Sequence, residues 1–107
     1  MSETLQKVRR LVEEGTVRIS EHGYDELADD GIHVREVISG LVNARLVEDY
    51  PDYPKGPCVL VLQTGREDRP IHAVWGIPKG RSGPAVLITA YRPDPELWEN
   101  GFLRRRP

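Results

Sequence analysis

Four short runs of strand-forming residues, rich in Val, Ile and Leu, occupy the second half of this chain. They cover residues 46–50, 58–64, 71–77 and 85–91, with turn residues such as Pro, Gly and Asp between them. Their starts lie roughly a dozen residues apart, which leaves no helix-length segment between them. This spacing predicts an antiparallel meander of four strands.

The first half of the chain instead carries apolar residues at helical spacing. Ser2 and Ser20 are suitable N-caps, and Gly15 and Gly31 stand where the first two helices would end. We predict helices over 3–14, 20–29 and 33–43, and a short strand or extended link over 16–19. The expected buried residues of the second helix are Tyr24, Leu27 and Ala28.

The start of the third helix has the strongest local signature. Ile32 and Val37 stand at hydrophobic-staple positions, and Glu36 stands where a capping-box carboxylate belongs. The predicted fold class is therefore α+β, with three N-terminal helices packed on one face of a four-stranded antiparallel sheet.

The size and composition of the chain exclude several classes of protein. Its 107 residues are the size of one domain, so we treat residues 1–107 as a single domain. The longest apolar stretch is residues 58–62, far too short for a membrane-spanning helix, and the N-terminus lacks the pattern of a signal peptide. One cysteine permits no intrachain disulfide. We therefore expect a cytoplasmic protein with no membrane partner.

The formal net charge of −2 conceals an asymmetry between the two halves of the chain. Residues 1–54 carry 6 Lys and Arg against 12 Asp and Glu, whereas residues 55–107 carry 9 against 5. The second half is thus the more suitable partner for an anionic ligand.

Two histidines are candidates for acid–base chemistry. His22 lies in the first turn of the predicted second helix, where a neutral imidazole suits a general base. The alternative is a histidine that hydrogen-bonds the nearby backbone and orders the helix start. His72 alternates with Ile71 and Ala73 in the third strand and so faces away from the helices. Its alternative role is that of a half-exposed sheet histidine.

The end of the last strand supplies further candidates, Tyr91 and Arg92. In one possible register of the last two strands, His72, Thr89 and Tyr91 share a face, and a one-residue slip separates them. Lys79 and Arg81 lie in the glycine-containing turn between these strands, where they are candidates for phosphate binding or simply exposed turn residues.

The C-terminal segment holds aromatic and basic residues. Trp98 and Phe102 stand at helical spacing before three consecutive arginines, residues 104–106. This segment either docks by its aromatic residues or stays loose, and its arginines are either solvated or contact nucleic acid.

No two histidines have the spacing of metal ligands, so we predict no metal and no cofactor.

Several motifs together resemble a known family. Residues 17–27 read VRISEHGYDEL, residues 30–41 read DGIHVREVISGL, residues 46–51 read LVEDYP, and residues 88–93 read ITAYRP. This set resembles the bacterial domain-of-unknown-function 4258 family over a core of about residues 16–94, which leaves 95–107 as a tail. That family is similar to the BrnT and RelE/ParE toxin superfamily. The resemblance implies a RelE-like or BrnT-like fold and a ribonuclease neutralised by a paired antitoxin.

Two functions follow as hypotheses. The first is a toxin-like, metal-independent endoribonuclease in which His22 or His72 takes the proton of a ribose 2′-hydroxyl. Positive charge from Arg92, Lys79 or Arg81 would stabilise the pentavalent transition state, and Tyr91 would position the substrate. RNA or the ribosome and an antitoxin would be the partners. The second is a noncatalytic protein-binding module that docks through the sheet or through the Trp98 and Phe102 tail.

Overall fold

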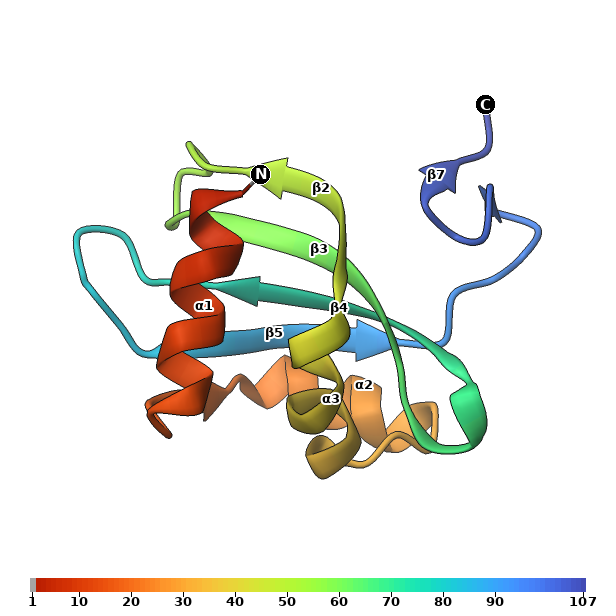
Figure 1. Ribbon diagram of the computed structural model, residues 1–107, viewed down its shortest axis with the longest axis horizontal. Coiled ribbons are helices and arrows are strands. Elements are labelled where there is room, and N and C mark those ends of the chain that lie inside the picture. The colour runs from red at the N-terminus through yellow and green to blue at the C-terminus, as the bar shows by residue number, and fades with distance from the viewer. Residues whose placement is uncertain (1) are drawn as a thin grey trace.

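The computed structural model describes residues 2–107, which form three helices, a five-stranded sheet and a small two-stranded ribbon (Figure 1). The helices are α1 (Glu3–Glu13), α2 (Glu21–Asp29) and α3 (Val34–Gly40), the last followed by the 3₁₀ turn η1 (Leu41–Asn43). They confirm the three predicted helices. Ser2 accepts a hydrogen bond from the Leu5 N–H and Ser20 accepts one from the Gly23 N–H, so both predicted caps are in place.

The strands of the main sheet are β1 (Val17–Ile19), β2 (Arg45–Tyr50), β3 (Cys58–Thr64), β4 (Pro70–Gly76) and β5 (Ala85–Tyr91). A second 3₁₀ turn, η2 (Arg66–Asp68), joins β3 to β4. The ribbon consists of β6 (Trp98–Glu99) and β7 (Arg104–Arg105).

The sheet corrects the predicted fold class, although the class remains α+β. The strand order is β1-β5-β4-β3-β2, and β1 runs parallel to β5, so the sheet is five-stranded and mixed rather than four-stranded and antiparallel. A short strand was one of the two expectations for residues 16–19, but its place in the main sheet was not predicted. A strand of three residues is too short to show an alternating pattern, and its partner β5 is the strand of the main sheet most distant from it along the chain.

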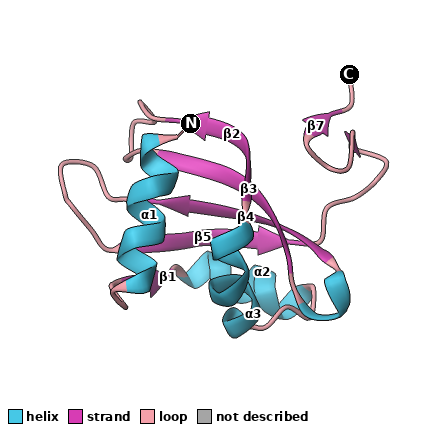
Figure 2. Ribbon diagram, in the orientation of Figure 1, coloured by secondary structure: helices cyan, strands magenta, loops and turns pink. Residues whose placement is uncertain are grey.

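The helices and the sheet enclose one hydrophobic core. In the view of Figure 2, α1 crosses the strands on one face of the sheet, and α2 lies along β5 at the edge of the sheet. All three helices contribute to the core, through residues such as Leu5, Leu27 and Val37. The sheet contributes alternate residues of its central strands, including the fully buried Val61, Ala73 and Trp75. Because successive strand residues point to opposite faces, His72 and Val74 belong to the other face, which we call the open face.

Of the three residues predicted to be buried in α2, Leu27 is confirmed and the other two are wrong. Tyr24 is 55 % exposed and Ala28 is exposed, whereas Leu27 and Gly23 are buried. A β-carbon on Gly23 would lie 2.9 Å from the Leu87 carbonyl oxygen, so the helix approaches β5 at a glycine rather than through a tyrosine. The approach is held by Ser20, whose hydroxyl donates to the Ile88 carbonyl at 2.7 Å.

The C-terminal segment docks by its aromatic residues, one of the two expected outcomes. Trp98 is 5 % exposed and its ring packs edge-on against the ring of His72. The ribbon that carries Trp98 therefore covers part of the open face. Within residues 2–107, no helix has both the length and the apolar character needed to cross a membrane.

Candidate functional site

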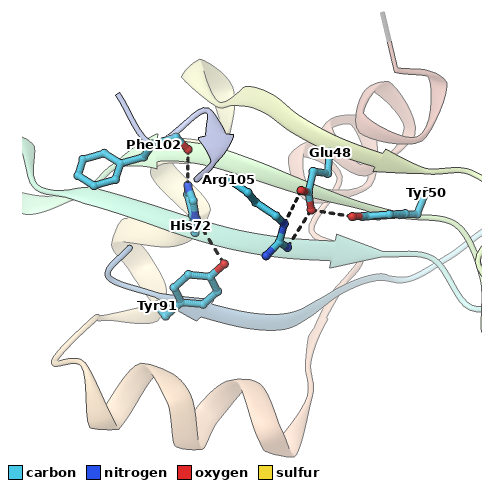
Figure 3. Close-up of polar contacts among 6 residues, drawn as sticks. All are labelled: Glu48, Tyr50, His72, Tyr91, Phe102 and Arg105. Atoms are coloured by element: carbon cyan, nitrogen blue, oxygen red, sulfur yellow. Dashed lines mark hydrogen bonds and ion pairs between the residues drawn. The ribbon is translucent and has the colours of Figure 1, made fainter. Parts of the chain in front are cut away.

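His72 lies at the centre of a polar cluster on the open face (Figure 3). Its side chain is fully buried, and its Nε2 lies 2.8 Å from the carbonyl oxygen of Phe102. A carbonyl only accepts hydrogen bonds, so Nε2 carries the proton and donates. Nδ1 of the neutral ring is then the acceptor, and the Tyr91 hydroxyl donates to it at 3.3 Å.

The strand register brings these two side chains together. His72 pairs with Tyr91 and Val74 pairs with Thr89, so all four residues belong to one face, as one of the two predicted registers requires. The register then shifts, and Trp75 pairs with Leu87, which leaves Ile88 as an extra residue in β5. This bulge keeps the polar pair on the open face while Leu87 stays in the core.

Burial sets the protonation state of both groups. It lowers the pKa of His72 below its ordinary value, and this effect outweighs the Phe102 carbonyl and the Glu48 charge, which favour the charged ring. Burial also raises the pKa of Tyr91. At neutral pH the pair is therefore an uncharged imidazole and an uncharged phenol.

An ion pair between Arg105 and Glu48 holds the C-terminal ribbon next to His72 and Tyr91. The Arg105 guanidinium donates from Nε to Glu48 Oε2 at 2.7 Å and from Nη2 to Glu48 Oε1 at 3.1 Å, a two-point contact. Tyr50 also donates its hydroxyl to Glu48 at 2.6 Å. The hydrogen bonds from Arg105 lower the pKa of Glu48 despite its partial burial, so the carboxylate stays ionised. Arg105 also lies 4.7 Å from the centre of the Trp98 ring.

A hollow of about 250 Å³ adjoins the cluster on the open face. Its apolar residues are Cys58, Leu60, Val74 and Ile88. Its polar residues are Glu48, Arg105 and three tyrosines, namely Tyr50, Tyr53 and Tyr91. Burial raises the pKa of the Cys58 thiol, which keeps it protonated and unreactive.

Of the six predicted site residues, the structure brings together only His72 and Tyr91. His22 is exposed on α2, where its Nε2 lies 3.5 Å from Glu26. Lys79 and Arg81 are exposed in the loop beyond the far end of β4. His72 lies at the near end of the same strand, about 13 Å away along its length.

Arg92 points to the side of the sheet opposite Tyr91, its neighbour in the chain. The Arg92 Nη2 lies 3.6 Å from Glu36 of α3, and the Arg92 N–H donates to Asp30 at 2.8 Å. Arg92 therefore contacts the helical layer and does not reach the His72–Tyr91 pair.

Sequence reasoning missed Glu48, Tyr50, Tyr53 and Arg105. A signal existed for Glu48 and Tyr50, because two residues spaced by two in a strand share a face. The run of arginines at 104–106 stands out in the sequence, but nothing local distinguishes Arg105, which reaches Glu48 only through the docked ribbon. Among residues 2–107, no group of three or more His, Cys, Asp or Glu side chains is arranged to hold a metal ion.

The comparisons with known proteins identify the family and nothing narrower. The family described as domain of unknown function (DUF4258) matches residues 19–92. No curated protein and no solved structure matches the chain. The expected similarity to BrnT and to the RelE/ParE toxins thus gains no support. The match covers well over half of the sequence, and the chain belongs to the DUF4258 family.

Proposed function

We propose that this protein is a noncatalytic protein-binding module whose open sheet face binds a short peptide segment of a partner. The observation that carries the proposal is that this face already holds such a segment. The tail, residues 95–107, lies outside the family match, yet its ribbon docks on β4 of the family domain. The partner segment would take the place of this tail.

The tail contacts are of the kinds that peptide recognition uses. Trp98 supplies a buried aromatic anchor, the Phe102 carbonyl accepts a hydrogen bond from His72, and Arg105 makes the two-point ion pair with Glu48. Aromatic residues and arginine are enriched among the residues that dominate binding energy at interfaces. A partner segment would therefore carry an aromatic residue and an arginine placed as they are in the tail.

The hollow extends the same face. It contains apolar side chains and three tyrosines, a combination that gives large contact area together with hydrogen-bonding hydroxyls. Its volume of about 250 Å³ suits one large apolar side chain of the partner segment.

The test uses a labelled peptide of residues 94–107 and the full-length protein. In the Trp98→Ala/Arg105→Ala variant the protein's own tail competes poorly, so we expect the peptide to bind this variant more tightly than the parent. Adding Glu48→Gln to the variant should weaken binding by roughly tenfold, because the arginine of the peptide loses its charged partner.

Two controls make the result specific. Glu26→Gln removes an exposed carboxylate from α2 and should leave peptide binding unchanged. A peptide with Ala in place of both Trp and Arg should not bind. If the labelled peptide binds neither the parent nor the weakened-tail variant, the open face is not a peptide-binding surface and the proposal is wrong.

A second candidate, the metal-independent endoribonuclease of toxin type, is favoured by the His72–Tyr91 pair. Tyr91 lines the hollow and its hydroxyl bonds the neutral imidazole. A ribose 2′-hydroxyl placed there would pass its proton through Tyr91 to His72 while its oxygen attacks the adjacent phosphorus. The bond from phosphorus to the 5′-oxygen would break, that oxygen would take a proton from water and leave as a hydroxyl, and the imidazolium of His72 would return its proton to the hydroxide so formed. Of the predicted cations, Arg92, Lys79 and Arg81 do not reach the His72–Tyr91 pair, so none of them would stabilise the transition state there.

This candidate requires the tail to open, because His72 is fully buried beneath it. RNA cleavage in the presence of EDTA should then increase in Trp98→Ala, disappear in Trp98→Ala/His72→Gln, and survive in Trp98→Ala/His22→Gln. The absence of cleavage of free or ribosome-bound RNA by both the parent and Trp98→Ala would exclude the nuclease and leave the peptide-binding module. An antitoxin partner is proposed only together with the nuclease.

A further inference from the structure

A second depression lies on the helical side of the molecule, away from the open face. It has a volume of about 200 Å³ and is bordered by Gly31, Glu36, Arg66, Glu67, Arg69 and Arg92. Roughly 10–15 Å³ of such volume is enough for one water molecule, so the depression admits a larger polar group. The residues come from the ends of α2 and α3, the η2 turn and the end of β5.

Arg92 borders this depression, and its guanidinium makes few hydrogen bonds within the protein. Its side chain is only 17 % exposed. Nη1 donates to the Pro70 carbonyl at 3.3 Å, and Nη2 lies 3.6 Å from Glu36, too far for a hydrogen bond. Nε is buried and has no partner within residues 2–107. A guanidinium has five N–H donors, and within residues 2–107 this one makes a single hydrogen bond to protein, from Nη1 to the Pro70 carbonyl.

Glu36 makes no hydrogen bond to Arg92, because their contact from Oε1 to Nη2 is 3.6 Å long. Its Oε2 accepts the His33 N–H at 3.0 Å and its Oε1 accepts the Arg66 N–H at 3.1 Å. Burial raises the pKa of Glu36, but these two N–H groups and the Arg92 charge outweigh it and lower the pKa overall. The carboxylate is therefore ionised and committed to the backbone of the capping box and of η2.

The turn between β3 and β4 places two more arginines at the same depression. The Arg69 N–H bonds the Arg66 carbonyl at 3.2 Å, and the two residues between them, Glu67 and Asp68, have φ values of 58° and 56°. Turns with two such residues favour Asn and Gly. The turn thus keeps two residues in a strained backbone conformation and presents two exposed arginines at the depression that Arg92 also borders.

We propose that this depression binds a phosphate group. The Arg92 guanidinium would bind it from the inner side, and the side chains of Arg66 and Arg69 would bind it from the turn. Planar guanidinium groups bind phosphate oxygens in pairs, and three of them outweigh the two carboxylates at the site. The site is separate from the open face, so it stands whether or not the proposed peptide binding does.

The test is a titration of the full-length protein with inorganic phosphate at constant ionic strength, followed by ¹H–¹⁵N NMR. We expect saturable shifts of the backbone amides of Gly31, Arg66 and Arg92. Arg66→Gln and Arg69→Gln should each weaken binding by roughly tenfold, because both side chains are exposed and each removes a charged donor without disturbing the core. The matched control is Arg81→Gln, an exposed arginine in a different loop, which should bind as the parent does.

Two further measurements complete the test. Arg92→Lys keeps the charge but loses the planar fork, so a folded Arg92→Lys protein should bind phosphate more weakly than the parent. Sodium acetate, titrated in the same way, should bind far more weakly than phosphate. Shifts that do not saturate, equal losses in Arg81→Gln and Arg66→Gln, or acetate binding as tight as phosphate binding would each overturn the assignment.

Discussion

At the scale of single residues, His72 shows how one side chain can join a sheet to a tail. Both of its ring nitrogens are bonded, one to Tyr91 of the neighbouring strand and one to the Phe102 carbonyl of the C-terminal segment. Its ring also contacts Trp98. The neutral form of His72 therefore stabilises the docked tail, whichever function the open face serves.

The lowered pKa of His72 predicts a pH-dependent stability. The unfolded chain binds a proton at this residue near the ordinary histidine pKa of 6.5, whereas the folded chain binds it only at lower pH. The stabilisation is complete above pH 6.5 and is lost as the pH falls through the folded-state pKa. Urea denaturation at a series of pH values between 7.5 and 5 should show the free energy of unfolding falling less steeply in His72→Gln than in the parent.

The exposed His22 provides the control for this prediction. Its side chain is 66 % exposed, so His22→Gln should keep the slope of the parent. Equal slopes for the parent and His72→Gln would mean that His72 does not titrate differently in the folded and unfolded chains.

At the scale of elements, two neighbouring residues of the 3₁₀ turn after α3 differ sharply in burial. Leu41 is 2 % exposed and Val42, the next residue, is 68 % exposed. Leu41→Ala should lower the free energy of unfolding by about 2–4 kcal/mol because it leaves a cavity. Val42→Ala, its neighbour, should change the stability by less than about 0.5 kcal/mol. Urea denaturation of both variants measures the difference, and equal losses would contradict this packing.

The close contact of α2 with β5 predicts that Gly23→Ala destabilises the protein, the opposite of what helix propensity alone predicts. In an exposed helix, Gly→Ala is stabilising, but a β-carbon on Gly23 would lie 2.9 Å and 3.1 Å from the carbonyl oxygens of Leu87 and Ile88. We expect Gly23→Ala to destabilise the protein by about 1–3 kcal/mol. Asp25→Ala, at an exposed position of the same helix, should be neutral or slightly stabilising in the same thermal denaturation experiment. A higher melting temperature for Gly23→Ala would show that α2 can move away from β5.

At the scale of the whole molecule, the main sheet and the C-terminal ribbon should differ in stability. The β2–β5 strands are paired along most of their length, whereas β6 and β7 pair over only two residues each. Trp98→Ala should therefore release the ribbon without unfolding the sheet. Hydrogen exchange should show rapid exchange of the Arg106 amide, which bonds the Leu97 carbonyl, while the amides of Ala73 and Ala90 stay protected. Loss of protection at all three amides would mean that the sheet depends on the ribbon.

In the folded molecule the arginines of the tail lie next to carboxylates. The sequence shows three consecutive arginines, but Arg104 and Arg106 lie near Glu99, and Arg105 binds Glu48. Each guanidinium thus has a carboxylate nearby. The tail is consequently a less available contact for nucleic acid than its sequence suggests.

The sequence by itself determined the local elements of this protein. The Ser2 and Ser20 caps, the capping box around Glu36, and the strand-forming composition of four runs are short-range signals, and all of them correspond to observed structure. Such features depend on hydrogen bonds and apolar patterns among residues close together in the sequence. They can therefore be predicted without knowledge of the tertiary fold.

Tertiary structure alone decided which elements meet and therefore which site exists. The parallel pairing of β1 with β5, the burial of Gly23 in place of Tyr24, and the separation of Arg92 from Tyr91 all depend on the arrangement of distant segments. Glu48 and Arg105 form their pair across more than half of the chain. The physical reason is that contacts between distant segments are set by how the whole chain buries its apolar surface, which no window of neighbouring residues records.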